Sequence, residues 1–83
     1  MRIVLCNTRT GLYFQGPEGW TGEPRLAHDF GSSLKAALFA QEQRFKHVEV
    51  LVDFDDPEYN VHLPVQAQLS YHAIESREEQ NTA

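Results

Sequence analysis

The chain of 83 residues has a single cysteine and no long apolar run. Cys6 cannot form a disulfide within the chain, whereas small secreted domains commonly carry several. No stretch approaches the ~20 apolar residues that cross a bilayer, and the apolar start at residues 3–6 is too short for the core of a signal peptide. We therefore expect an intracellular, cytoplasmic protein with no membrane role. Cys6 is expected to be a buried strand residue rather than a reactive thiol.

Positive charge is scarce as well. Seven Lys and Arg stand against twelve Asp and Glu, which gives a net charge of -5. Repulsion from phosphate groups and anionic lipids opposes nonspecific binding to either, so we expect no nucleic-acid partner. A hydrophobic content of 41% is that of an ordinary globular chain, and the length has room for one domain.

The first third of the chain predicts a hairpin followed by a loop. The β-prone runs 3–6 and 12–14 are joined by a short polar connection that ends in glycine. Residues 16–24 hold three Gly and two Pro, a composition typical of loops. Trp20 lies in the middle of this loop, and two roles stay open for it: an anchor over the sheet edge, or a contact with a ligand or partner.

One helix is predicted, from a cap at Ser32 or Ser33 to about Arg44. At about 100° per residue one apolar stripe faces the core. The stripe consists of Phe30, Leu34, Ala37, Leu38 and Phe45. Phe39 falls outside it, so we expect Phe39 to be either a singly exposed residue or part of a partner surface.

Two alternating segments predict strands in the second half. Residues 48–54 place valines on one face and acidic residues on the other, with Leu51 on the polar side, so the second face is expected to be partly covered. From Val61 to Ala73 every odd position is apolar, which predicts one long strand of about 43 Å at 3.3 Å per residue. Pro64 lacks an amide hydrogen and restricts this strand to a sheet edge or a bend.

These elements predict an α+β domain over residues 1–74. Its order is β-β-α-β-β, with a mainly antiparallel sheet and one helix packed on one face. Residues 75–83 are polar and lack a hydrophobic pattern, so we expect a disordered tail.

Part of the chain resembles a class of short bacterial proteins. The shared motifs are Tyr-x-x-Gly at Tyr13 and Gly16, Trp-Thr at Trp20 and Thr21, and Ala-x-x-Phe at Ala27 and Phe30, followed by an Ala-rich helix. The resemblance spans Tyr13 to Val65, about half to two thirds of the chain, and the alternating run after Pro64 lies outside it. It implies a small α+β domain of bacterial or phage origin, and it implies no activity.

No motif predicts an enzyme, a cofactor or a metal site. The acidic turn lacks the glycine and the ligand spacing of an EF-hand loop, and the histidines lack the spacing of zinc ligands. The acidic residues are Asp53, Asp55, Asp56 and Glu58, and the histidines are His28, His47, His62 and His72. The triplet at 29–31 matches a kinase motif by chance, because the other kinase motifs are missing.

Three functions are compatible with the sequence. The first is a noncatalytic interaction module that forms a homodimer through its long C-terminal strand, or binds another protein there. Its interface would consist of Val61, Leu63, Val65, Leu69 and Tyr71. The second is a small-ligand binding protein that uses the Trp20 loop, with Tyr13, Trp20 and Phe39 as contacts. The third is an acidic decoy that binds a regulatory protein in place of nucleic acid.

Overall fold

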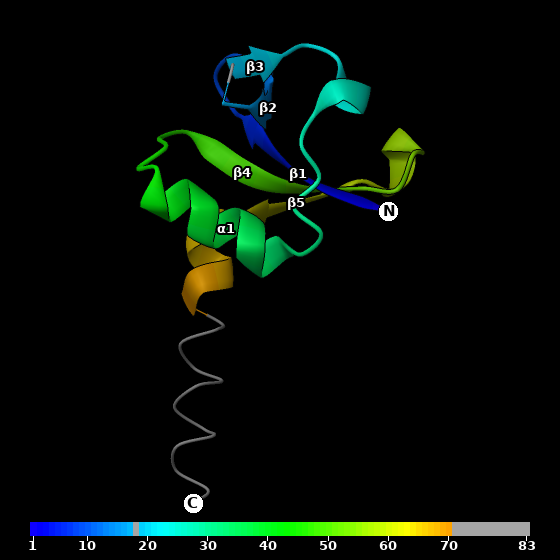
Figure 1. Cartoon of the computed structure of the whole chain (residues 1–83). Helices are drawn as coiled ribbons and strands as arrows, with labels where there is room; N and C mark the ends of the chain where they lie inside the picture. Colours follow the sequence, from blue (N-terminus) through cyan, green and yellow to red (C-terminus); the bar gives the residue numbers. More distant parts are fainter. Residues whose placement is uncertain (18, 71–83) are drawn as a thin grey trace, which may run out of the picture.

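The computed structural model describes residues 1–17 and 19–70. Five antiparallel strands form one sheet in the order β3-β2-β1-β4-β5, and the helix α1 crosses one of its faces (Figure 1). The bounds are β1 Arg2–Asn7, β2 Tyr13–Gly16, β3 Gly19–Thr21, α1 Ser33–Glu42, β4 Val48–Asp53 and β5 Val61–Pro64, with short 3-10 helices η1 at Pro24–Leu26 and η2 at Pro57–Tyr59. The predicted α+β class with an antiparallel sheet is confirmed.

The centre of the sheet is buried on both faces. β1 and β4 pair over six residues, from Arg2 opposite Asp53 to Asn7 opposite Val48. Because side chains alternate along a strand, one set faces α1 and the next set faces the opposite side. The helix-side core contains Ile3, Leu5, Phe14, Val50 and Val52 with three alanines of α1, and the opposite core contains Val4, Ala27 and Leu51 beside Tyr13. The expected cover over Leu51 is thus confirmed.

Cys6 lies in β1 with 8% of its surface exposed, as predicted. Burial raises the pKa of the Cys6 thiol, and the nearby Glu49 carboxylate raises it further. A higher pKa means less thiolate, which is the reactive form. The structure therefore supports a packing role for this side chain.

The predicted order β-β-α-β-β is wrong, because the Gly- and Pro-rich segment contains a strand of its own. β3 pairs with β2, with Trp20 opposite Phe14 and Thr21 opposite Tyr13. Gly16 and Gly19 pair across the turn and have φ of 155° and 128°, a region open to glycine because it has no Cβ. These residues build the turn of a hairpin, and a strand of three residues is too short to show a pattern.

The predicted long strand is also wrong, because β5 ends at Pro64 and residues 65–70 are helical. Val65 and Leu69 pack against the helix-side core, and a spacing of four residues puts both on one face of a helix. Gln68 Oε1 accepts a hydrogen bond of 3.0 Å from Ser33 Oγ of α1. A segment with an apolar residue at every second position also has apolar residues four positions apart. The pattern is therefore compatible with a strand and with a helix in residues 65–70. Tyr71, Ala73 and the predicted tail lie outside the described residues.

The face of α1 that meets the sheet agrees with the predicted stripe at Ala37 and differs from it at Leu38. Ala36, Ala37 and Ala40 are buried, whereas Leu38 is 42% exposed. Small methyl groups let the helix axis approach β1 and β4 closely, and the larger side chains then lie at the sides of the contact. In the part of the chain that the structure describes, no helix is long and apolar enough to cross a bilayer.

Candidate functional site

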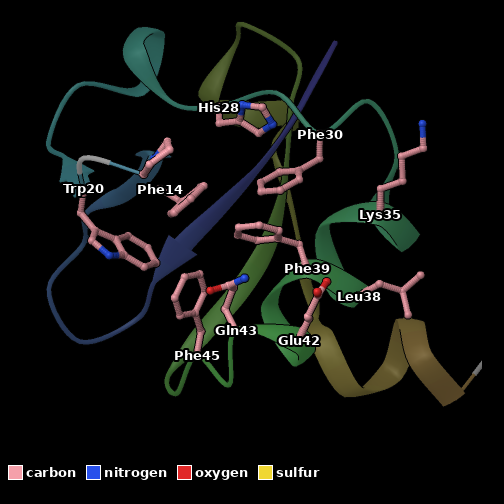
Figure 2. Close-up of a pocket in the computed structure, with 13 residues that line it drawn as sticks. Phe14, Trp20, His28, Phe30, Lys35, Leu38, Phe39, Glu42, Gln43 and Phe45 are labelled. Carbon is pink, nitrogen blue, oxygen red and sulfur yellow. The ribbon is translucent and has the colours of Figure 1, made fainter.

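The helix side of the sheet holds an open pocket with a volume of about 890 Å³. Ligand sites in proteins span roughly 300–1,000 Å³ and are lined mainly by apolar side chains. Five aromatic rings line the interior, namely Phe14 of β2, Trp20 of β3, Phe30, Phe39 of α1 and Phe45 (Figure 2). Sheet, helix and connecting segments thus all contribute to one aromatic surface, which we call the aromatic pocket.

Phe14 lies at the centre of this surface and is 8% exposed. Its ring centroid is 5.1 Å from that of Phe39 and 5.6 Å from that of Trp20. The rings of Phe45 and Phe30 follow at 5.7 Å and 6.0 Å. All four distances fall in the range of about 4.5–7 Å that is typical of aromatic pairs. The rings therefore pack against one another as one cluster and hold one another in place.

The segment 24–31, which we call the strap, carries one wall of the pocket. The His28 amide donates to the Phe14 carbonyl and the Phe30 amide to the Ile3 carbonyl, each at 2.8 Å. Asp29 Oδ1 accepts hydrogen bonds from the amides of Ile3 and Gly31, both at 3.0 Å. These bonds place Phe30 beside Phe14, and the His28 ring packs edge-on against Phe30 with centroids 4.6 Å apart.

The side chains of Arg2 and Asp29 fix the strap to β1. The Arg2 guanidinium donates to the carbonyl of Pro24 at 2.7 Å and also to that of Ala27. The amides of Ile3 and Gly31 lower the pKa of the Asp29 carboxyl, because both hydrogen bonds favour its charged form. Backbone and side chains together thus hold the wall at His28 and Phe30.

The opposite wall depends on how α1 ends. The Phe45 amide donates to the Ala40 carbonyl and the Arg44 amide to the Gln41 carbonyl, both at 3.0 Å, and Arg44 has a φ of 57°. This is the hydrogen-bond pattern of a Schellman motif, in which the residue after the left-handed one turns back onto the helix. The motif brings the ring of Phe45 to 5.9 Å from that of Phe39.

The rim of the pocket is polar and carries charges of both signs. It consists of His28, Lys35, Glu42 and Gln43, all exposed. Within residues 1–17 and 19–70, neither Lys35 nor Glu42 forms an ion pair. Lys35 belongs to the first turns of α1 and extends away from the rings in Figure 2, whereas Glu42 is the last residue of the helix.

The structure brings together two of the three predicted ligand contacts. Trp20 and Phe39 both line the aromatic pocket. Tyr13 lies on the opposite face of the sheet, against Val4 and Leu51, where burial raises the pKa of its hydroxyl. Alternation along β2 explains the separation, since Tyr13 and its neighbour Phe14 must point to opposite faces.

Sequence reasoning missed three of the pocket residues. Phe30 and Phe45 were predicted to lie in the core stripe of the helix, and Phe14 was treated only as a strand residue. A signal was present, because aromatic residues flank both ends of the helix and one lies on it. To assign these residues to one cluster, one must know where the strap and the Schellman motif lead the chain. A helical projection of the sequence does not show this.

The predicted dimer interface is divided in the structure. Val61 is 43% exposed on the edge strand β5. Leu63, Val65 and Leu69 pack against the helix-side core of the same chain. Tyr71 lies outside the described residues. Self-association is untested by this arrangement, but most of the apolar side chains assigned to it already have partners within the chain.

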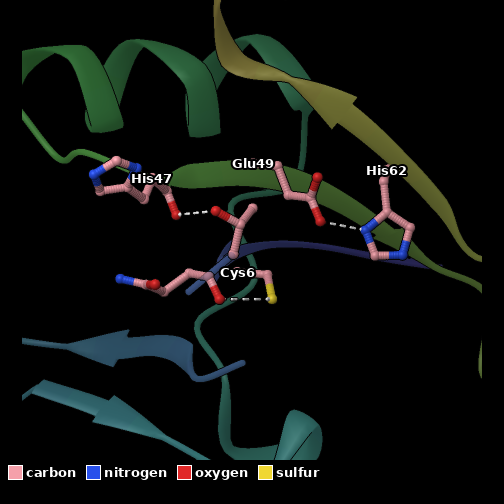
Figure 3. Close-up of polar contacts among 6 residues, drawn as sticks. Cys6, His47, Glu49 and His62 are labelled. Atoms are coloured by element: carbon pink, nitrogen blue, oxygen red, sulfur yellow. Dashed lines mark hydrogen bonds and ion pairs between the residues drawn. The ribbon is translucent and has the colours of Figure 1, made fainter. Parts of the chain in front are cut away.

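Outside the pocket, the polar contacts within residues 1–17 and 19–70 form no second site. Glu49 Oε1 and His62 Nδ1 lie 2.5 Å apart on neighbouring strands, and the Cys6 thiol contacts the Asn7 carbonyl at 3.7 Å (Figure 3). The acidic turn uses its carboxylates locally, as in the hydrogen bond of 2.9 Å from the Asp55 amide to Asp53 Oδ1. Among the described residues, no three His, Cys, Asp or Glu side chains are grouped so as to hold a metal ion.

Comparison of the chain with family models, with curated proteins and with solved structures finds no match in any of the three. The candidate function therefore rests on the geometry of the aromatic pocket.

Proposed function

We propose that the protein is a noncatalytic binding protein that takes a small, mainly apolar ligand in the aromatic pocket. One observation carries the proposal: Trp20, Phe30, Phe39 and Phe45 are each only half-buried although they surround the buried Phe14. Apolar rings that line a concave surface lose an unfavourable contact with water when a ligand covers them. Large exposed apolar surfaces of this kind commonly mark binding sites.

The chemistry of the lining supports binding rather than catalysis. Among the described residues that line the pocket, the ionisable side chains are His28, Lys35 and Glu42, all on its rim. Nucleophilic catalysis needs a nucleophile within hydrogen-bond reach of a base, and within residues 1–17 and 19–70 no hydrogen bond or ion pair joins two of these three side chains.

Trp20 provides a direct test, because it is the chain's one tryptophan and lines the pocket. We expect small neutral probes such as cyclohexanol to change its fluorescence in a saturable manner. Phe45→Ala, which removes one wall, should abolish the response. Leu26→Ala is the matched control, because Leu26 is 57% exposed and does not line the pocket. A response that is absent in the wild type, or unchanged in Phe45→Ala, would remove the proposal.

Self-association through β5 is a second proposal, favoured by a separate observation. In the part of the chain that the structure describes, β5 is the last strand of the sheet, and its residue Val61 is 43% exposed. An unpaired strand edge can pair with the same edge of a second copy. Light-scattering chromatography tests this: a wild-type dimer that becomes a folded monomer in Val61→Lys supports it, and a monomeric wild type contradicts it.

A further inference from the structure

We propose that the ligand of the aromatic pocket is a small organic cation of the quaternary ammonium type, bound as a free molecule. The inference rests on the proposed function of the pocket and names the chemical class of its ligand. The arrangement of the rings and the electrostatics of α1 both support it.

Three rings lie close enough together to be in reach of one cation. The centroids of Phe14, Trp20 and Phe45 form a nearly equilateral triangle, with sides of 5.6, 5.3 and 5.7 Å. The ring planes are inclined to one another by 49° to 77°. A cation within about 6 Å of a ring centroid is attracted by the negative face of the ring. A methylated ammonium group seated over the centre of this triangle is within that range of three rings at once.

The helix supplies negative potential at the same place. Glu42 and Gln43 form the C-terminal end of α1 and line the pocket. The C-terminal end of a helix carries the negative partial charge of its macrodipole, and Glu42 adds a full negative charge there. Glu42 follows Phe39 by three residues, so the two side chains occupy neighbouring positions on the helix surface.

The positive charge on the rim lies at the other end of the helix. Lys35 precedes Glu42 by seven residues, which separates their Cα atoms by about 10 Å along the axis at 1.5 Å per residue. Lys35 extends away from the rings in Figure 2. Arg44 and Lys46 follow Glu42 in the chain but do not line the pocket, so Glu42 is the charged lining residue at the end near Phe39 and Phe45. The net charge of the chain, -5, also attracts cations.

A pair of isosteric probes tests the inference on the full chain. Choline carries a quaternary nitrogen, and its neutral dimethylbutanol isostere has carbon in that place. Neither absorbs where tryptophan does, so the fluorescence of Trp20 and calorimetry report binding of both. We expect choline to bind about tenfold more tightly than the isostere, within the range given by cation–π attraction.

Two variants on the rim separate the charge from the shape. Glu42→Gln should weaken choline binding about threefold and leave the isostere unchanged. Lys35→Gln removes a positive charge from the same rim and should strengthen choline binding. Both residues are exposed, so the fold is expected to tolerate either change.

Each outcome is decisive. Equal binding of the two probes overturns the cation inference and leaves the proposed function standing, whereas binding of neither contradicts both. Tighter binding of the dimethylbutanoate anion than of choline overturns the assigned charge. A trimethyl-lysine peptide that binds at least tenfold more tightly than choline overturns the choice of a free molecule as ligand.

Discussion

Phe39 and Phe45 face each other around the end of α1, with ring centroids 5.9 Å apart. Phe39 belongs to the helix, whereas Phe45 follows its C-terminal cap, and the chain reverses direction between them at Arg44. In a Schellman motif an apolar contact of this kind commonly accompanies the two capping hydrogen bonds. The local end of one helix thus places a residue of the aromatic pocket.

Replacing Arg44 by glycine is expected to stabilise the fold. Arg44 has a φ of 57°, a conformation that costs a residue with a Cβ roughly 1–2 kcal/mol. Part of that gain is offset because glycine is more flexible in the unfolded chain. We expect Arg44→Gly to raise the free energy of unfolding by about 0.5–1 kcal/mol in urea titrations. Arg44→Ala is the control that keeps a Cβ, and an equal gain there would contradict the conformational explanation.

The cap of α1 depends on one of its two serines. Ser32 Oγ accepts a hydrogen bond of 3.1 Å from the Lys35 amide, whereas Ser33 Oγ donates to Gln68. Ser32→Ala should lower the free energy of unfolding by about 1 kcal/mol, and Ser32→Asn should restore most of it because Asn also caps helices. Thermal unfolding of the two variants compares them directly. An equal loss of stability in Ser32→Ala and Ser32→Asn would exclude the capping role of Ser32.

Acid should loosen the strap through Asp29. The Ile3 and Gly31 amides lower its pKa in the folded state below the ordinary value, so its ionised form favours folding. The contribution is therefore present above the unfolded pKa of about 3.9 and is lost as pH falls through the lower folded pKa. Asp29→Asn keeps an acceptor oxygen without this titration. The free energy of unfolding, measured with urea at neutral and at acidic pH, should fall more in the wild type than in Asp29→Asn. Equal falls in the two proteins would contradict this role of Asp29.

The fold class follows from local patterns that tertiary contacts leave intact. Alternation in residues 48–54 and the buried run at β1 gave the central strands, and the position of Leu51 correctly indicated a covered second face. Local sequence patterns failed where the same residue type is common in two different structures. Gly16 and Gly19, which predicted a loop, form the turn between β2 and β3.

The aromatic pocket was only half predictable for a related reason. Trp20 and Phe39 stand out in the sequence because Trp20 lies in a Gly- and Pro-rich segment and Phe39 falls outside the predicted apolar stripe. Phe14, Phe30 and Phe45 had places in a strand or stripe, so nothing in the pattern set them apart. Their meeting depends on the hydrogen bonds from His28 and Phe30 to β2 and β1, which join residues far apart in the sequence.

The face that α1 presents to the sheet can be tested at neighbouring positions. Ala37 is completely buried and Leu38 is 42% exposed. Leu38→Ala should therefore change the free energy of unfolding by no more than about 0.5 kcal/mol. Ala37→Leu should cost roughly 1–3 kcal/mol, because a well-packed core does not accept the added volume. Chemical denaturation compares the two variants, and a larger loss in Leu38→Ala than in Ala37→Leu would indicate that Leu38 packs in the core, as the predicted stripe has it.

Residues 65–70 offer the sharpest contrast between helix and strand. A strand would place Val65, Ala67 and Leu69 on one face, whereas the helix packs Val65 and Leu69 against the core and leaves Ala67 exposed. Leu69→Asp should then destabilise the fold by at least about 2 kcal/mol, because it places an unpaired charge against the core. Ala67→Asp, the matched control, should stay within about 0.5 kcal/mol of the wild type. Similar losses in both variants would indicate the strand, and with it the long edge that the sequence pattern first suggested.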